Sequence, residues 1–176
     1  MNSLIEYRVE RIQHVLNLRA AAQSLSELLK HPANSDVQYE FPATYERYTG
    51  DIGSVADNLA LASADCSTGK KQQWIMFAGE QAVGMSVVRK TETVPELIPK
   101  DIPNVSLFVC FPFRNGGIGK LAMSACIETV NLQFGGAAWA SVKHHNRPSQ
   151  RLVLSAGFRP VTIADLETIY SYNMRD

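Results

Sequence analysis

The chain has 176 residues, of which 45% are hydrophobic, and 17 basic residues balance 17 acidic ones. This composition excludes a disordered chain, and the balanced charge argues against nucleic acid or a membrane surface as a partner. No apolar run is long enough to span a bilayer, so we expect a single domain over residues 1–176. The three cysteines are far apart and lack metal-ligand spacing. With no signal-peptide pattern, they indicate small buried residues in a reducing, cytoplasmic compartment and no bound metal.

Hydrophobic periodicity and turn residues predict the elements of the first half of the chain. In chain order we expect a strand over Ile5–Val9, a helix over Arg11–Leu29, an irregular aromatic-rich segment over 32–50, a helix over Val55–Ala62, and strands over Trp74–Ala78 and Ala82–Val88. Three prolines between residues 91 and 103 then predict a loop.

The second half opens with a continuous apolar run, which is typical of a strand covered on both faces. We expect a strand over Val105–Phe111, a helix from Gly117 to Gly135, a strand over Ala137–Val142, a helix over Arg147–Ser155, and strands over Phe158–Ile163 and Thr168–Asn173. Pro148 and Gly157 delimit the shorter helix. This order predicts a mixed α/β sheet with helices on its faces.

A glycine-rich loop, Arg114-Asn115-Gly116-Gly117-Ile118-Gly119, joins the apolar run to the long helix. Glycine lets the backbone approach a ligand, and the first turn of a helix offers unpaired N–H groups and a positive dipole end to a phosphate. Arg114 adds a cation at the rim. For the glycines alone, an ordinary flexible turn is the alternative. A P-loop and a dinucleotide fingerprint are both rejected, because Lys120 precedes a leucine and no acidic residue ends the next strand.

A second motif begins at Asn146 and ends at Gly157-Phe158. With the Arg114 loop, it resembles the GNAT acetyltransferase superfamily. The family's loop pattern is Arg or Gln, two residues, Gly, one residue, then Gly or Ala. Its later pattern is an Asn after a strand, a short helix and a closing Gly-Phe. The element order fits as well, so the resemblance covers nearly the whole chain.

The resemblance implies the GNAT acyl-CoA N-acyltransferase fold, a mixed, mostly antiparallel sheet with helices on both faces and a splayed parallel strand pair. It implies an acetyl-CoA-dependent N-acetyltransferase that acts without a metal on a primary amine of a small molecule or protein. A homodimer stays open. The implied cofactor-binding residues are Leu107, Phe108, Val109, Arg114, Asn115, Gly116, Gly117, Ile118, Gly119, Lys120, Asn146 and Ser149. For the Lys120 side chain, phosphate contact and a solvated surface both stay open.

The catalytic groups follow the family pattern only in part. Many members carry a tyrosine four residues before the closing glycine, where this chain has Val153. Members similar to the ribosomal-protein N-terminal acetyltransferases carry Asn-x-x-Ser, which Asn146 and Ser149 match. Ser149 either hydrogen-bonds the departing thiolate or only caps a helix. The general base stays open among His144, His145, Glu40, Glu92 and Asp101.

The family usually holds its acceptor between the early helices and the last strand. Aromatic residues in those segments favour an aromatic-lined acceptor pocket: Tyr39, Phe41, Tyr45, Tyr48, Tyr170 and Tyr172. Core packing is the alternative for about half of them. The valine at position 153 keeps a second function open, namely a non-catalytic acyl-CoA-binding sensor or interaction module.

Overall fold

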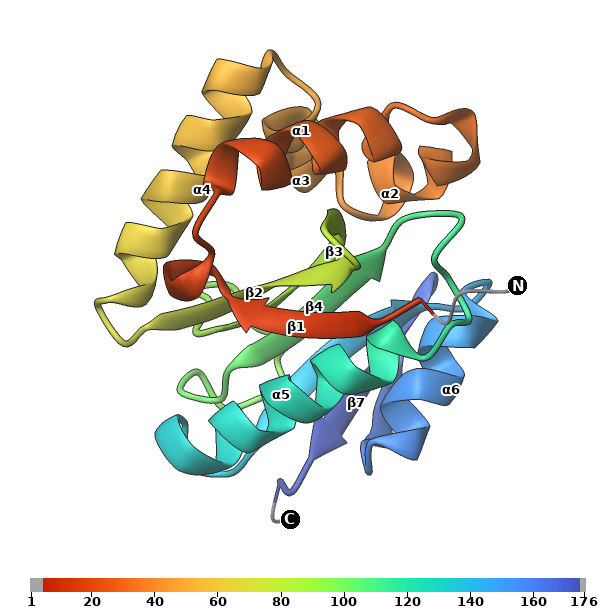
Figure 1. The fold of residues 1–176 in the computed structure, drawn as a ribbon. Helices are drawn as coiled ribbons and strands as arrows, with labels where there is room; N and C mark the ends of the chain where they lie inside the picture. The colour runs from red at the N-terminus through yellow and green to blue at the C-terminus, as the bar shows by residue number, and fades with distance from the viewer. Residues whose placement is uncertain (1–4, 175–176) are drawn as a thin grey trace.

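A seven-stranded sheet forms the centre of the computed structural model, which describes residues 5–174 (Figure 1). Its strands are β1 (Tyr7–Arg11), β2 (Lys71–Ala78), β3 (Gln81–Arg89), β4 (Asn104–Val109), β5 (Ala138–Lys143), β6 (Arg159–Ile163) and β7 (Glu167–Tyr172). Their order in space is β1-β2-β3-β4-β5-β7-β6. Neighbouring strands are antiparallel except β4 and β5, which are parallel. The predicted mixed, mostly antiparallel sheet is therefore confirmed.

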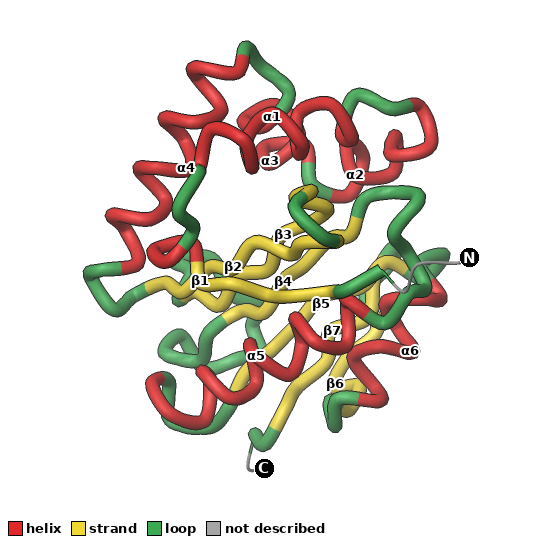
Figure 2. Tube along the Cα trace, in the orientation of Figure 1, coloured by secondary structure: helices red, strands yellow, loops and turns green. Residues whose placement is uncertain are grey.

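Helices cover both faces of the sheet (Figures 1 and 2). Above it in this view lie α1 (Leu18–Leu29), α2 (Ser35–Glu40), α3 (Pro42–Tyr48) and α4 (Ile52–Cys66), with 3-10 turns at Ile12–His14 and Pro32–Asn34. On the other face, α5 (Ile118–Gln133) packs on β1, β3 and β4. The short α6 (Arg147–Ser155) packs on β5 and α5.

The sheet separates two main hydrophobic clusters. On one side, Leu25 of α1 and Leu59 of α4 pack with Ile75 of β2. On the other side, Cys126 and Val130 of α5 belong to a cluster with the inner residues of β5 and β7. The three cysteines are free and buried, as predicted.

The helix predicted from Arg11 begins seven residues later, at Leu18. Asn17 precedes it, and its side-chain Oδ1 accepts the Ala20 N–H at 2.9 Å. Asparagine is a strongly preferred N-cap, and this bond fixes the start of the helix. The apolar residues before it serve other roles, because Ile12 is buried in a 3-10 turn whereas Leu16 is exposed.

Residues 32–50, predicted to be irregular, contain two helices. These helices have 6 and 7 residues, fewer than two full turns, so they show no apolar period over a sequence window. Pro42 begins α3, where a proline's missing N–H removes no helical hydrogen bond. The aromatic residues of α3 face inward, with Tyr48 buried and Tyr45 half-buried.

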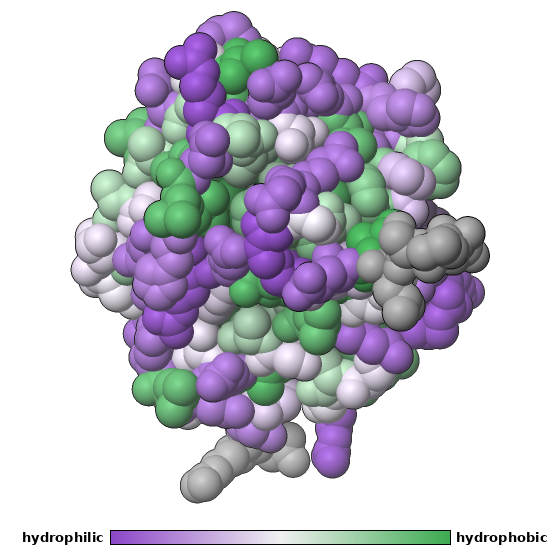
Figure 3. Space-filling model, in the orientation of Figure 1, coloured by the Kyte–Doolittle hydropathy of each residue, from purple (hydrophilic) through white to green (hydrophobic). Residues whose placement is uncertain are grey.

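The remaining elements lie close to their predicted positions. Helix α4 begins earlier than predicted because Asp51 caps it by accepting the Ser54 N–H at 3.0 Å, and it also continues to Cys66. Strand β4 ends at Val109, so Phe111 lies in the following turn and its side chain is exposed. Hydrophilic and hydrophobic residues are interspersed on the face that carries β1 and α5 (Figure 3). Within residues 5–174, none of the helices combines the length and apolar character needed to cross a membrane.

Candidate functional site

Strands β4 and β5 diverge along most of their length. Their one parallel pair joins Asn104 and Trp139, and the Trp139 N–H donates to the Pro103 carbonyl at 3.0 Å. On its other side β4 pairs with β3 throughout. Beyond Asn104, β4 therefore has one edge that β5 leaves unpaired.

The direction of the β4 backbone decides which groups line this edge. The Cys110 N–H donates to the Val83 carbonyl at 2.8 Å, and in an antiparallel ladder the direction of these groups alternates along the strand. The N–H and C=O groups of Phe108 thus point to β3, and those of Leu107 and Val109 point to the edge facing β5. The Val109 carbonyl already accepts from Arg114 Nε, so we call the other three main-chain groups of Leu107 and Val109 the open edge of β4.

The loop between β4 and α5 presents a run of free backbone donors. Asn115 and Gly117 have positive φ values of 65° and 91°. Within residues 5–174, the N–H groups from Asn115 to Gly119 have no hydrogen-bond partner. Such a run at a helix N-terminus is suited to bind an anion. The open edge of β4 leads along the chain into this loop.

Two positions of this loop require glycine, each for a different structural reason. Gly117 is in the left-handed region with open space around it, so a side chain there would strain the backbone. At Gly116 a Cβ would overlap the hydroxyl and ring of Tyr7. The loop therefore lies directly against β1, a contact between segments more than a hundred residues apart.

Arg114 is bound to the protein itself. Its Nε donates to the Val109 carbonyl at 2.8 Å, and its Nη2 donates to Asn34 Oδ1 at 3.1 Å and to Asp36 Oδ1 at 2.9 Å. The pair with Asp36 is an ion pair. The guanidinium is thus engaged by three acceptors and does not stand free at the rim. Contact with a cofactor phosphate stays a prediction for this residue.

Asn34 holds the loop from the other side. It is fully buried; its Nδ2 donates to the Leu28 carbonyl at 2.7 Å, and its Oδ1 accepts the Phe111 N–H at 2.7 Å. Because it also accepts from Arg114, this one amide joins α1 to the start of the β4–α5 loop. The sequence offered no signal for it.

At α6, Asn146 is the cap, and Ser149 is not. The Asn146 Oδ1 accepts the Ser149 N–H at 3.2 Å, so the predicted capping role of the Ser149 hydroxyl is wrong. The Gln150 side chain donates to the carbonyls of Lys143 and His144 and ties the helix to the end of β5. Val153 is buried in the core.

The candidate bases remain spread around the molecule. His144 is half-buried, and its Nε2 is buried without a hydrogen-bond partner within residues 5–174. The His145 ring lies 6.2 Å from that of Tyr39. Glu92 and Asp101 are exposed in the loop between β3 and β4, and the Glu40 side chain lies outside the described part of the chain. The general base thus stays open.

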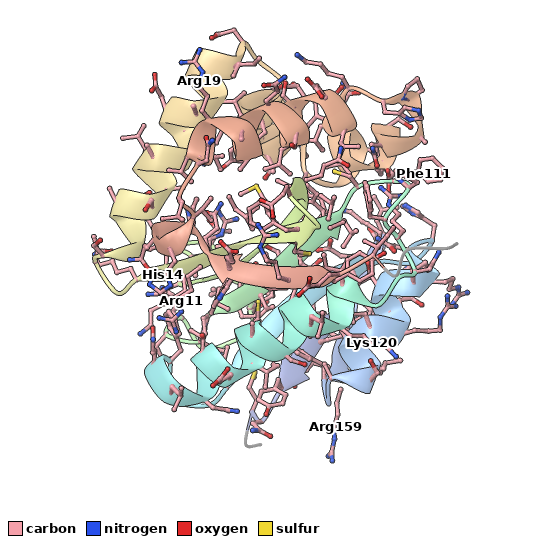
Figure 4. The ribbon with its side chains drawn as sticks, in the orientation of Figure 1. Arg11, His14, Arg19, Phe111, Lys120 and Arg159 are labelled. Atoms are coloured by element: carbon pink, nitrogen blue, oxygen red, sulfur yellow. The ribbon has the colours of Figure 1, made fainter. Side chains whose placement is uncertain are left out.

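A groove of about 540 Å³ lies between α5 and α6. It is lined by Lys120, Met123, Ser124, Ile127, Glu128, Asn131, Leu152, Ser155 and Ala156. Lys120 is exposed at the loop end of this groove, where α5 faces α6 (Figure 4). A phosphate contact for its side chain stays a prediction.

A smaller pocket, of about 60 Å³, lies on the other face of the sheet. It is lined by Phe41, Thr44, Arg47, Tyr48, Lys71, Gln73, Met85, Ser86, Val87, Arg89, Ser106, Leu107 and Phe108. We call it the α3–sheet pocket. It includes two of the aromatic residues named for the acceptor side, whereas Tyr170 and Tyr172 belong to the cluster around α5. Its three cationic residues were not predicted.

Comparison with known proteins gives matches at the level of structure. The ribosomal-protein-S5-alanine acetyltransferase of Vibrio fischeri superposes with a TM-score of 0.68 at 12% identity, covering 96% of this chain and 93% of that one. The chain has the GNAT acetyltransferase fold. The GNAT domain of S. lividans PAT matches with a TM-score of 0.67 at 12% identity, over 96% of this chain and 90% of that one. No family model and no curated protein matches the sequence.

A third structure with the GNAT fold is yncA of Salmonella typhimurium, solved with acetyl-CoA. It matches with a TM-score of 0.61 at 15% identity and covers 96% of this chain and 93% of that one. At sequence identities of 12–15%, the comparisons establish the fold alone. The mostly antiparallel sheet with its parallel β4–β5 pair agrees with it.

Proposed function

We propose that this protein is an acetyl-CoA-dependent N-acetyltransferase that acetylates a primary amine of a small molecule or a protein. The observation that carries the proposal is a continuous binding surface. The open edge of β4 leads into a loop whose N–H groups from Asn115 to Gly119 have no partner in the described part of the chain. An unpaired strand edge binds an extended amide chain, and a run of N–H donors binds a pyrophosphate. Coenzyme A joins these two groups in one molecule.

Each residue of this surface has a separate role. The backbone of Leu107 and Val109 would pair with the amides of the pantetheine arm. The free N–H groups from Asn115 to Gly119 would surround the pyrophosphate, with the positive end of α5 behind them. Arg114 is better suited to position the loop, because reaching a phosphate would break its ion pair with Asp36.

When bound, acetyl-CoA supplies an acetyl group activated as a thioester. In the transfer, a C–N bond forms to the acceptor amine and the C–S bond breaks. The amine loses one proton, and the departing sulfur gains one. We assign to Ser149 a hydrogen bond to the departing sulfur. Its side chain is half-buried, and its hydroxyl makes no hydrogen bond within residues 5–174. A hydroxyl free of other partners can donate to a thiolate.

One observation favours a second function. Val153 occupies the position where many members of the family carry a tyrosine, and its side chain is buried. A protein that lacks that phenol could bind acyl-CoA without turning it over, as a sensor or interaction module. Thiol release from acetyl-CoA in the presence of amines and peptides separates the two, because only the enzyme consumes the thioester.

The binding surface is tested by two matched glycine variants. Gly117 and Gly135 stand at opposite ends of α5, both with positive φ and with open space around them. Gly117→Glu and Gly135→Glu thus impose the same backbone strain, but only the first places a carboxylate in the loop. We expect calorimetry to show at least a tenfold weaker Kd for coenzyme A in Gly117→Glu, which corresponds to about 1.4 kcal/mol, and no change in Gly135→Glu. Equal coenzyme A affinities in the two folded variants would show that this loop does not bind the cofactor.

A further inference from the structure

The α3–sheet pocket brings together three cations from three different elements. Arg47 comes from α3, Lys71 begins β2 and Arg89 ends β3. Lys71 and Arg89 are directly opposite each other in the β2–β3 register, so their side chains project from the same face of the sheet. Among the side chains that the structure describes, no aspartate or glutamate lines this pocket.

Within residues 5–174, none of these three cations forms an ion pair, and Arg47 and Arg89 are exposed at the pocket. Lys71 is half-buried, and burial lowers its pKa, with Arg47 and Arg89 lowering it further. The carboxylate that acts on Lys71 is Asp65, which raises its pKa less than burial lowers it. Like charges gathered at one pocket repel one another, and an anion bound among them removes that repulsion.

The floor of the pocket adds neutral polar groups. Tyr48 and Gln73 are buried, and the Tyr48 hydroxyl interacts with the side chains of Gln73 and Arg47. Burial raises the pKa of Tyr48, which keeps its hydroxyl protonated at neutral pH. The pocket therefore combines three cations with a neutral hydroxyl and an amide, which are the partners that an oxyanion prefers.

The pocket also lies beside the proposed acyl site. Ser106, Leu107 and Phe108 line it, and Leu107 contributes to the open edge of β4. The ring centroids of Phe108 and of Phe41, the residue between α2 and α3, lie 6.1 Å apart, so the pocket lies on the side of β4 that the helices α1–α4 cover. A molecule held there would lie across β4 from the face that α5 covers.

Resting on the proposed function, we propose that the acceptor is an amine that carries a carboxylate or a phosphate, and that Arg47, Lys71 and Arg89 bind this anionic group. A volume of about 60 Å³ accommodates a single charged group, with the rest of the acceptor extending along β4. Polyamines and other cationic amines are then poor acceptors, because they would meet three like charges. The amine end of the substrate is the part that receives the acetyl group.

Anion binding is tested directly by NMR on the intact protein. Inorganic phosphate and succinate are titrated into protein saturated with coenzyme A, so that the glycine loop is occupied. We expect saturable shifts of the amides of Lys71, Arg89 and Ser106 that disappear in Arg89→Gln. Arg159→Gln, on a strand at the far edge of the sheet, is the matched control (Figure 4). Shifts absent from these amides, or unchanged in Arg89→Gln, would overturn the proposal.

Acetylation rates of amines with and without an anionic group show whether the pocket prefers a carboxylate or a phosphate. Glycine is compared with glycinamide, and phosphoethanolamine with ethanolamine. We expect kcat/KM to be at least tenfold higher for the anionic member of one pair, with Arg89→Gln removing that preference and Arg159→Gln keeping it. Faster acetylation of the neutral members by both proteins would overturn the proposal. If coenzyme A itself does not bind, the proposed function fails, and titration of the free protein still decides whether the pocket takes an anion.

Discussion

Asn34 is the side chain on which the position of the β4–α5 loop depends most, and Asn34→Ala measures that dependence. The substitution removes three hydrogen bonds of 2.7 to 3.1 Å, which join the side chain to the Leu28 carbonyl, the Phe111 N–H and the Arg114 guanidinium, and a longer one of 3.4 Å to the Phe111 carbonyl. Bonds of this kind contribute about 1 kcal/mol each, and the charged one is not counted higher because the Arg114 side chain is 31% exposed. We expect the free energy of unfolding to fall by about 3 kcal/mol, or Tm by about 6–12 °C.

Urea unfolding of the variant, followed by calorimetry with coenzyme A, checks this expectation. The affinity should fall with stability, because the ligand must then order a loop that has lost its attachment to α1. Asn58→Ala is the control, since the Asn58 side chain makes one hydrogen bond within residues 5–174, from its Nδ2 to the Arg47 carbonyl at 3.0 Å. A loss of stability in Asn34→Ala no larger than in Asn58→Ala would refute the role of Asn34.

Two further predictions concern the thiolate side of the reaction and the buried thiols. Ser149→Ala should lower kcat at least tenfold while the stability and the coenzyme A Kd stay unchanged, because Asn146 caps the helix; Ser155→Ala, on the same helix, should change none of the three. Burial raises the pKa of Cys110 and Cys126 from 9.0 to about 12. The folded state thus keeps protons that the unfolded state releases, and stability should fall from about pH 9 upward by about 1.4 kcal/mol per pH unit for each thiol. Urea unfolding at several pH values should show a shallower fall in Cys126→Ala, and an equal slope would contradict the assignment.

The sequence was sufficient to predict those elements whose ends are marked by nearby proline and glycine residues. Helix α6 has the predicted bounds, Arg147–Ser155, because Pro148 and Gly157 mark its two ends within a few residues of sequence. The glycine loop was predictable for the same reason, since positive φ at Gly117 needs a residue without a Cβ.

The features that the sequence could not predict depend on residues far apart in the chain. Arg114 was expected at the rim, but its partners Asn34 and Asp36 lie about eighty residues earlier, in a segment with no apolar period. The cations of the α3–sheet pocket come from positions 47, 71 and 89, and only the β2–β3 register and the packing of α3 bring them together. A charged residue whose spatial neighbours are unknown is interpreted from sequence as an ordinary solvated surface residue.

The single parallel pair between β4 and β5 has a consequence for how the molecule behaves as a whole. Across it, the sheet divides into β1–β4 and β5–β7, and beyond Asn104 and Trp139 side-chain packing replaces backbone pairing between the halves. Local opening of a fold starts where backbone hydrogen bonds are fewest. A molecule bound along β4 would act there as an additional strand. Binding of that molecule would then make unfolding more cooperative, because β1–β4 and β5–β7 would unfold as one unit instead of as two loosely coupled ones.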